Sequence, residues 1–198
     1  YQLDVQDRKQ CEKVAKQFLN DAGGIDYVIA NAGIGGDDNI FSGSSKSINN
    51  ILKTNIHGVT NILMPFIPLM KSQNHGYLVC VSSVASYMPL PFHGGYSSSK
   101  IAIRRIFDSW RPSLQKHNIN LVSICPGFID TPMVKGPARN FPLKKANEAA
   151  KIFINAIENK KHNFVYPRYY YLLIWLFTLT PLMFYNWFIK KMFSKPFN

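Results

Sequence analysis

Apolar and polar residues alternate along this chain with two different periods. Short apolar runs typical of buried strands occur at residues 25–30, 77–81, 119–125 and 163–166. Longer stretches with apolar side chains three and four residues apart predict helices over residues 47–71, 97–116 and 146–158. Another helix is predicted from one apolar face that carries Cys11, Val14, Ala15, Phe18 and Leu19, with Asp7 as its cap and Gly23 as its stop. Strands that alternate with helices predict an α/β fold with a parallel sheet covered by helices.

Ser83, Tyr96 and Lys100 have the chemistry of a proton-transfer site. Tyr96 and Lys100 are four residues apart, so in a helix both side chains lie on one face. An ammonium at ~4 Å, with an effective dielectric of ~20, contributes roughly 4 kcal/mol and lowers the pKa of a tyrosine by about 3 from ~10. Ser83 follows a predicted strand, at the sheet edge where open α/β sheets bind ligands. We therefore expect Tyr96 to act as a general acid or base, with a surface Tyr-Lys pair and a turn serine as the alternative.

Several other motifs occur in a fixed order around these three residues. They are Asn31-Ala32-Gly33 after the first predicted strand, Asn55 inside a predicted helix, Ser82-Ser83, and the segment from Pro126 to Thr131 after the third. Together with Tyr96 and Lys100, they make residues 1–167 similar to the short-chain dehydrogenase/reductase superfamily. The resemblance implies a Rossmann-like, doubly wound parallel sheet.

The resemblance also implies hydride transfer between NAD(P)H and a carbonyl or secondary alcohol. In the family pattern, Tyr96 exchanges the hydroxyl proton, Lys100 lowers the pKa of Tyr96 and binds the nicotinamide ribose, and Ser83 orients the substrate. Asn55 supports a water in a distorted helix that continues a proton relay. The substrate is thus expected to be a small-molecule carbonyl or alcohol.

The same resemblance assigns the cofactor-binding residues. Those expected on the adenine side are Asp4, Val5, Asn31, Ala32 and Gly33, and those near the nicotinamide are Tyr96, Lys100, Pro126, Gly127, Ile129 and Thr131. NADP or NAD is expected, with NADP favoured because it is frequent in the family. No metal is expected, because Cys11, Cys80 and Cys125 have neither metal-ligand nor CxxC spacing, and reduced, buried thiols in a cytoplasmic protein are predicted instead.

One family element is not present in the sequence. The resemblance calls for a strand, a Thr-Gly-x3-Gly-x-Gly turn and a helix, but Gly33-Ile-Gly35-Gly36 belongs to the Asn-Ala-Gly turn and has Asp38 where a third glycine is needed. We therefore expect a chain that lacks the first two βα units, with residues 25–30 as an apolar sheet edge. Such an edge aggregates or pairs with a partner, and a second copy of this chain in a homo-oligomer is one such partner. The alternative function is a truncated, inactive chain that acts only through interaction or membrane association.

The net charge of +12 is concentrated in the last third of the chain. Residues 135–198 contain 11 Lys and Arg against 2 Asp and Glu, whereas residues 1–134 contain 12 against 9. The sequence has no helix-turn-helix, zinc or RNP-like motif, so nucleic-acid binding is not predicted.

The basic third surrounds an uncharged stretch at residues 169–189. The flanking cations are Lys160, Lys161, Arg168, Lys190, Lys191 and Lys195. The stretch is long enough to span a bilayer, but Pro181, Thr178, Thr180 and Asn186 favour two short helices in the membrane interface, and a lid over the substrate pocket is the third alternative. We divide the chain into a partial Rossmann-type domain, 1–167, and a membrane-associated or lid segment, 168–198.

Membrane association predicts an apolar substrate and a location at the inner face of a membrane. Phe128, Met133 and Phe141, near the predicted pocket, agree with an apolar substrate. A soluble reductase of sugars or 3-oxoacyl thioesters is the alternative if the segment is only a lid.

Overall fold

The computed structural model describes residues 1–181, 183 and 187 and contains a parallel sheet of four strands. In spatial order these are β1 (Tyr27–Ala30), β2 (Gly76–Val81), β3 (Ile119–Pro126) and β6 (Asn163–Tyr166). Each lies within two residues of a predicted strand, because buried parallel strands read as continuous apolar runs. A second, two-stranded sheet pairs β4 (Ile129–Asp130) with β5 (Lys144–Lys145).

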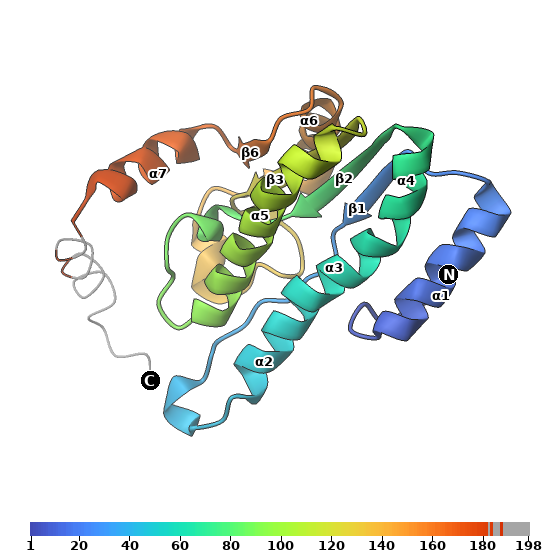
Figure 1. Ribbon diagram of the computed structural model, residues 1–198. Coiled ribbons are helices and arrows are strands. Elements are labelled where there is room, and N and C mark those ends of the chain that lie inside the picture. The colour runs from blue at the N-terminus through green and yellow to red at the C-terminus, as the bar shows by residue number, and fades with distance from the viewer. Residues whose placement is uncertain (182, 184–186, 188–198) are drawn as a thin grey trace.

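Helices cover both faces of the main sheet (Figure 1). They are α1 (Arg8–Ala22), α2 (Lys46–Leu52), α3 (Gly58–Leu63), α4 (Ile67–Gln73), α5 (Gly94–Gln115), α6 (Ala146–Glu158) and α7 (Tyr169–Leu179). The predicted ends of α1 are confirmed: the Asp7 carboxylate accepts the Gln10 N–H at 3.0 Å, and Gly23 ends the helix at a φ of 73°.

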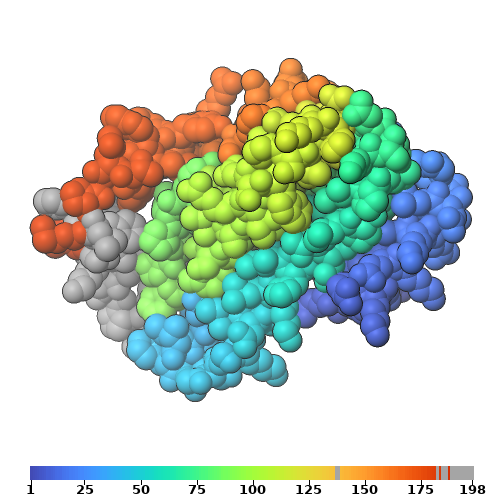
Figure 2. All heavy atoms as spheres, in the orientation of Figure 1, coloured from blue at the N-terminus to red at the C-terminus, as the bar shows by residue number. Residues whose placement is uncertain are grey.

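The helix predicted over residues 47–71 is present, but it is not a regular α-helix throughout. A π-helical turn, Lys53–His57, joins α2 to α3, and a 3-10 turn, Met64–Phe66, joins α3 to α4. Pro65 and Pro68 lack the N–H that an uninterrupted helix needs, which accounts for the second break. The π turn contains Asn55, and such turns are frequent at functional sites. The helical segment from α2 to α4 lies beside α5 (Figure 2).

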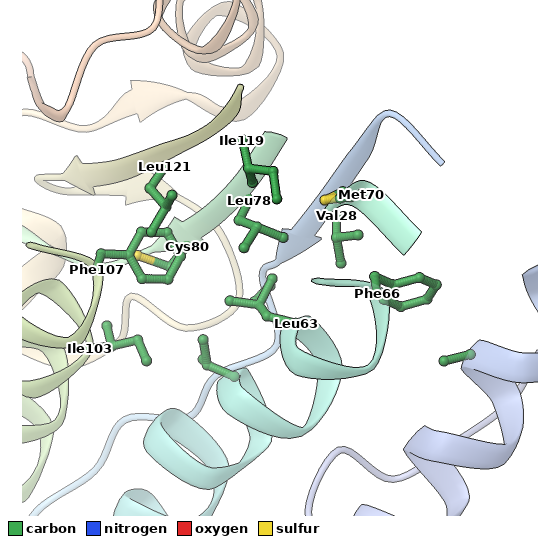
Figure 3. Packing of buried hydrophobic residues seen from close by; sticks show 13 residues of the cluster. Val28, Leu63, Phe66, Met70, Leu78, Cys80, Ile103, Phe107, Ile119 and Leu121 are labelled. Atoms are coloured by element: carbon green, nitrogen blue, oxygen red, sulfur yellow. The ribbon is translucent and has the colours of Figure 1, made fainter. Parts of the chain in front are cut away.

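Alternate residues of each central strand belong to different cores. On β2, Leu78 and Cys80 pack with α3 and α5, in a core that includes Leu63 and Phe107 (Figure 3). Val79 packs on the other face, against α6. Because the side chains alternate between the two faces of the sheet, helices can pack on both faces, as the predicted doubly wound sheet requires. The predicted α/β fold class is confirmed.

β1 is one edge of the main sheet. Val28 and Ala30 are buried, whereas Tyr27 is 44% exposed and Ile29 is 50% exposed. The predicted apolar edge is therefore present among the described residues. The cysteines also lie as predicted: Cys11, Cys80 and Cys125 are buried and reduced.

α7 follows β6 and leaves the main body at the end opposite α1 (Figure 1). Its buried residues, Tyr170 and Ile174, pack on Cys125 and Val165. The helix ends at Leu179, before Pro181, as the sequence predicts. The later part of the predicted segment, with Lys190, Lys191 and Lys195, lies outside the described residues. No helix within the described part of the chain is long and apolar enough to cross a membrane.

Candidate functional site

Ser83 and Tyr96 meet at the carboxyl ends of β2 and β3. Ser83 comes two residues after β2, and its Oγ lies 3.5 Å from the Pro126 carbonyl oxygen at the end of β3. The Ser83 Oγ also accepts the Ala85 N–H at 3.1 Å, so its position is fixed by the turn that follows the strand. Tyr96 belongs to the first turn of α5, and its hydroxyl hydrogen-bonds with Ser83.

Lys100 lies one turn after Tyr96 and is only 5% exposed. Its Nζ donates to the Val81 carbonyl at 2.8 Å, and its own carbonyl accepts the Ser82 Oγ at 2.8 Å. These two bonds fix α5 to the end of β2. Burial lowers the pKa of Lys100 to about 8.

The predicted lowering of the Tyr96 pKa by Lys100 is wrong for this structure. Burial raises the pKa of Tyr96, and the hydrogen bond with Ser83 offsets only part of that increase. The Lys100 Nζ is 5.7 Å from the centroid of the Tyr96 ring and is directed to Val81. Lys100 therefore does not lower the pKa of Tyr96 in this structure, and Tyr96 is a neutral phenol at neutral pH.

Asn55 links the π turn to the Asn31-Ala32-Gly33 loop. Its Oδ1 accepts the Ile34 N–H at 2.9 Å, and its Nδ2 donates to the Ile34 carbonyl at 2.9 Å and to the Ser99 Oγ at 3.0 Å. A Cβ added to Gly33 would lie 3.2 Å from the Lys100 Nζ and 3.3 Å from the Asn55 Oδ1. The structure thus places Asn55 near Lys100, as the expected proton relay requires, and it places Gly33, which was expected on the adenine side, beside both.

A cavity of about 230 Å³ lies where the adenine side of the cofactor is expected. Val5, Asn31 and Ala32, all expected in cofactor binding, line it together with Ile29 and Gly58. A Cβ on Gly58 would come within 2.7 Å of the Val5 Cγ2, so glycine is needed for this approach. Small and apolar walls of this kind fit a flat ring. Asp4 is not part of the lining; it is exposed, and its Oδ1 accepts the Gln6 N–H at 2.9 Å.

The sequence predicts that the backbone at Gly127 lies close to a ligand. In the structure, a side chain of the same chain occupies this position. A Cβ on Gly127 would clash with the ring of Tyr170 from α7. Burial raises the pKa of Tyr170, and the phenol also hydrogen-bonds with the backbone of Phe128. Ile129 lies in β4, and the Thr131 Oγ1 donates to the Ile129 carbonyl at 3.3 Å. Their contact with a nicotinamide stays a prediction.

Two side chains at the site were missed from sequence. Ser99 is fully buried and joins Asn55 to the Tyr96 carbonyl, which its Oγ reaches at 2.7 Å. Arg104 is 8% exposed, with its guanidinium 3.7 Å from the centroid of the Tyr87 ring and its Nη2 3.3 Å from the Ser86 carbonyl. Arg104 could have been found from spacing, because it continues the four-residue interval of Tyr96 and Lys100; nothing comparable marks Ser99.

Comparisons with known proteins agree with these motifs. A family model described as short chain dehydrogenase matches residues 1–140. The 3-oxoacyl-[acyl-carrier-protein] reductase FabG of Thermotoga maritima is 32% identical over 135 residues, which cover 68% of this chain and 55% of that protein. The 17-beta-hydroxysteroid dehydrogenase 13 of Homo sapiens is 30% identical over 174 residues, covering 85% of this chain and 58% of that protein. This chain thus spans little more than half the length of either relative.

A solved structure supports the fold. A short chain dehydrogenase/reductase from Burkholderia phymatum, in complex with NAD, matches with a TM-score of 0.80 at 19% identity. The match covers 88% of this chain and 72% of that one.

Proposed function

Because the chain belongs to the short-chain dehydrogenase family, we propose that it carries the proton-transfer site of an NAD(P)-dependent oxidoreductase. The reaction interconverts a carbonyl and a secondary alcohol. The observation that supports this most is that Ser83, Tyr96 and Lys100 converge at the carboxyl ends of the paired strands β2 and β3. Asn55 and Lys100 both lie beside Gly33.

Each side chain has a defined role in this proposal. The Ser83 hydroxyl orients the substrate oxygen, and Tyr96 donates a proton to that oxygen during reduction. The raised pKa of Tyr96 keeps the phenol protonated at neutral pH, which suits reduction. The NAD(P) cofactor supplies the hydride chemistry when bound.

Lys100 is proposed to return a proton to Tyr96, a step for which its Nζ has to leave the Val81 carbonyl that it faces in this structure. Its pKa of about 8 lies close to neutral pH, so the ammonium releases a proton readily. Asn55 and Ser99 hold the surrounding backbone through Ile34 and Tyr96, and they keep this buried region polar.

The cofactor is proposed to lie across the carboxyl edge of the sheet. Val5, Asn31 and Ala32 would hold the adenine end, Gly33 and Lys100 the nicotinamide ribose, and the segment from Pro126 to Thr131 the nicotinamide. NADP is proposed ahead of NAD, since it is the more frequent cofactor in the family.

The substrate is proposed to be apolar and to come from a membrane surface. α7 contains no charged residue, and most of its side chains are exposed and apolar. Arg168 is exposed immediately before it, and Lys160 and Lys161 are exposed before β6, a combination that suits an anionic membrane interface. The 17-beta-hydroxysteroid relative agrees with an apolar substrate.

The test is oxidation of NADPH by the protein with an apolar aromatic diketone as the probe. We expect Tyr96→Phe to lower kcat/KM roughly 10²- to 10⁴-fold, because the phenol is the proton donor. Tyr27→Phe, on the exposed edge strand, is the control and should keep full activity. Equal activity of Tyr96→Phe and the unaltered chain would contradict the proposal. An unaltered chain with neither turnover nor NADPH binding would favour the alternative, action through interaction or membrane association alone.

A further inference from the structure

The carboxylate of Asp38 contacts the first turn of α5, 57 residues further along the chain. Its Oδ1 and Oδ2 both accept the Gly95 N–H, at 3.0 and 3.2 Å. The Asp38 N–H donates in return to the Phe92 carbonyl at 2.8 Å. Asp38 is 7% exposed and forms no ion pair within the part of the chain that the structure describes. The amides at the start of α5 are therefore what this buried carboxylate faces.

The local sequence provides a weak start for α5. Gly94 and Gly95 are its first two residues, and glycine is a poor helix former. His93, in the N-cap position, makes no capping hydrogen bond with its side chain. The first N–H groups of a helix need an acceptor from outside the helix, and at Gly95 Asp38 provides it.

The two glycines allow this long-range cap. A Cβ on Gly94 would lie 3.0 Å from the Asp38 Oδ2. A Cβ on Gly95 would lie 3.0 Å from the Oδ1 and 2.6 Å from the Ile48 Cγ1 of α2. Any larger residue at either position would press on the carboxylate. The pair thus weakens the helix start and at the same time admits its cap.

The loop that carries Asp38 also runs along Tyr96. A Cβ on Gly35 would lie 3.7 Å from the Cδ2 of the Tyr96 ring. Asn55 holds the same loop at Ile34, with two hydrogen bonds of 2.9 Å. The loop is therefore attached on both sides of this ring contact, at Ile34 to the π turn and at Asp38 to α5.

We propose that Asp38 is a positioning residue for Tyr96. It fixes the turn of α5 that begins immediately before Tyr96, and so holds the phenol against Ser83. The catalytic meaning rests on the proposed function of Tyr96, whereas the contact between Asp38 and α5 can be tested without any turnover.

Hydrogen exchange in the 198-residue chain, followed by mass spectrometry, tests the contact. We expect Asp38→Ala to speed exchange over residues 94–99 about tenfold, the effect of a lost helix cap. Asp38→Asn keeps an acceptor oxygen and should restore most of the protection. Asp37→Ala is the matched control, because Asp37 is the exposed neighbour and its carboxylate accepts the Asn39 N–H of the same loop at 2.6 Å. Its backbone carbonyl, which accepts the Ser47 Oγ, is kept in this variant. Unchanged exchange in Asp38→Ala would overturn the proposal.

The ionisation of Tyr96 separates positioning from simple stabilisation. Phenolate absorbance is titrated for each protein with Tyr96 present and again with Tyr96→Phe added. The difference between the two curves gives the titration of Tyr96 alone. We expect Asp38→Ala to bring the raised pKa of Tyr96 down toward its ordinary value of 10.0, because the loosened turn exposes the phenol. Asp38→Asn should keep it raised. Faster exchange with an unchanged Tyr96 titration would reduce Asp38 to a structural cap. Neither measurement depends on activity, so failure of the proposed function would leave both results readable.

Discussion

α5 and α7 both pack against the main sheet, but they place their polar and apolar residues in opposite ways. α5 buries Lys100, Arg104 and Arg111 together with two serines. α7 exposes a group of large apolar residues, which includes Leu172, Trp175, Leu176 and Leu179. Ordinary surface helices do neither. Both departures from the usual pattern mark regions where folding alone does not explain the residues.

The cations of α5 share one kind of partner. Lys100, Arg104 and Arg111 each donate to a backbone carbonyl, of Val81, Ser86 and Leu121 respectively. Burial of a charge is tolerated only where such bonds replace water. α5 is therefore attached to the sheet by several buried cations as well as by apolar contacts. α7 buries only Tyr170 and Ile174 among its own residues, and its hydroxyl contact with the sheet is that of Tyr171, which accepts the Val165 N–H at 3.1 Å and donates to the Asn163 carbonyl at 3.3 Å.

Removal of a buried cation from α5 should have the largest effect on stability. We expect Arg104→Ala to lower the free energy of unfolding by about 2 to 4 kcal/mol, because a cavity replaces the stacking on Tyr87 and the bond to Ser86. Urea denaturation measures this. Arg105→Ala, in the same helix with its side chain 73% exposed, should change stability by less than about 0.5 kcal/mol. Equal effects of the two substitutions would show that burial of Arg104 is energetically irrelevant.

The contact that anchors α7 should be the next most sensitive. Gly127→Ala places a Cβ against the Tyr170 ring and should lower the free energy of unfolding by about 1 to 3 kcal/mol through overpacking. Tyr170→Ala in the same chain removes the clash. The double variant should therefore be more stable than the two single losses predict when added. Strict additivity in this cycle would rule out the contact.

Burial of Lys100 should appear as a dependence of stability on pH. The pKa of Lys100 is about 8 in the folded chain, against an ordinary value of 10.5. At a pH between these two values, the unfolded chain therefore binds more protons than the folded chain. Stability relative to Lys100→Met should then rise with pH, by about 1 to 2 kcal/mol from pH 8 to pH 10. The comparison with Lys100→Met cancels the opposing titration of the cysteines. Lys116→Met, at the exposed position that follows α5, is the control for the loss of a lysine.

Changes on the outer face of α7 should have the smallest effect on folding. We expect Leu172→Glu with Leu176→Glu to leave stability within about 0.5 kcal/mol, because these side chains are 60% and 48% exposed. Flotation with vesicles that contain phosphatidylserine should nevertheless fall about tenfold or more, since an apolar face and its attraction to anionic lipid are both weakened. Ile154→Glu on α6, 55% exposed, is the matched control. Flotation lost equally in the control would point to charge alone.

The sequence predicted the strands better than the starts and breaks of helices. Apolar runs located all four main strands, because burial of both sheet faces leaves a local signal. α5 begins at Gly94, before the predicted start at residue 97, because its cap comes from Asp38, which is remote in sequence. Local patterns cannot contain that information.

The candidate site shows a similar division. The order of motifs predicted that Asn55 lies near Lys100, but not that Gly33 approaches both of them. It did not predict the electrostatics, because the sign of the Tyr96 shift depends on burial and on where the Lys100 Nζ points. Spacing gives proximity on a helix face, but not the direction of a long side chain.

The three buried cysteines can report the order in which parts of the chain unfold. Cys11 lies in α1, Cys80 in β2 and Cys125 in β3, and burial raises the pKa of all three thiols. In the folded chain they are therefore protonated and shielded from alkylating reagents. The order in which the three become labelled would show whether α1 detaches before the sheet opens, without any probe being introduced.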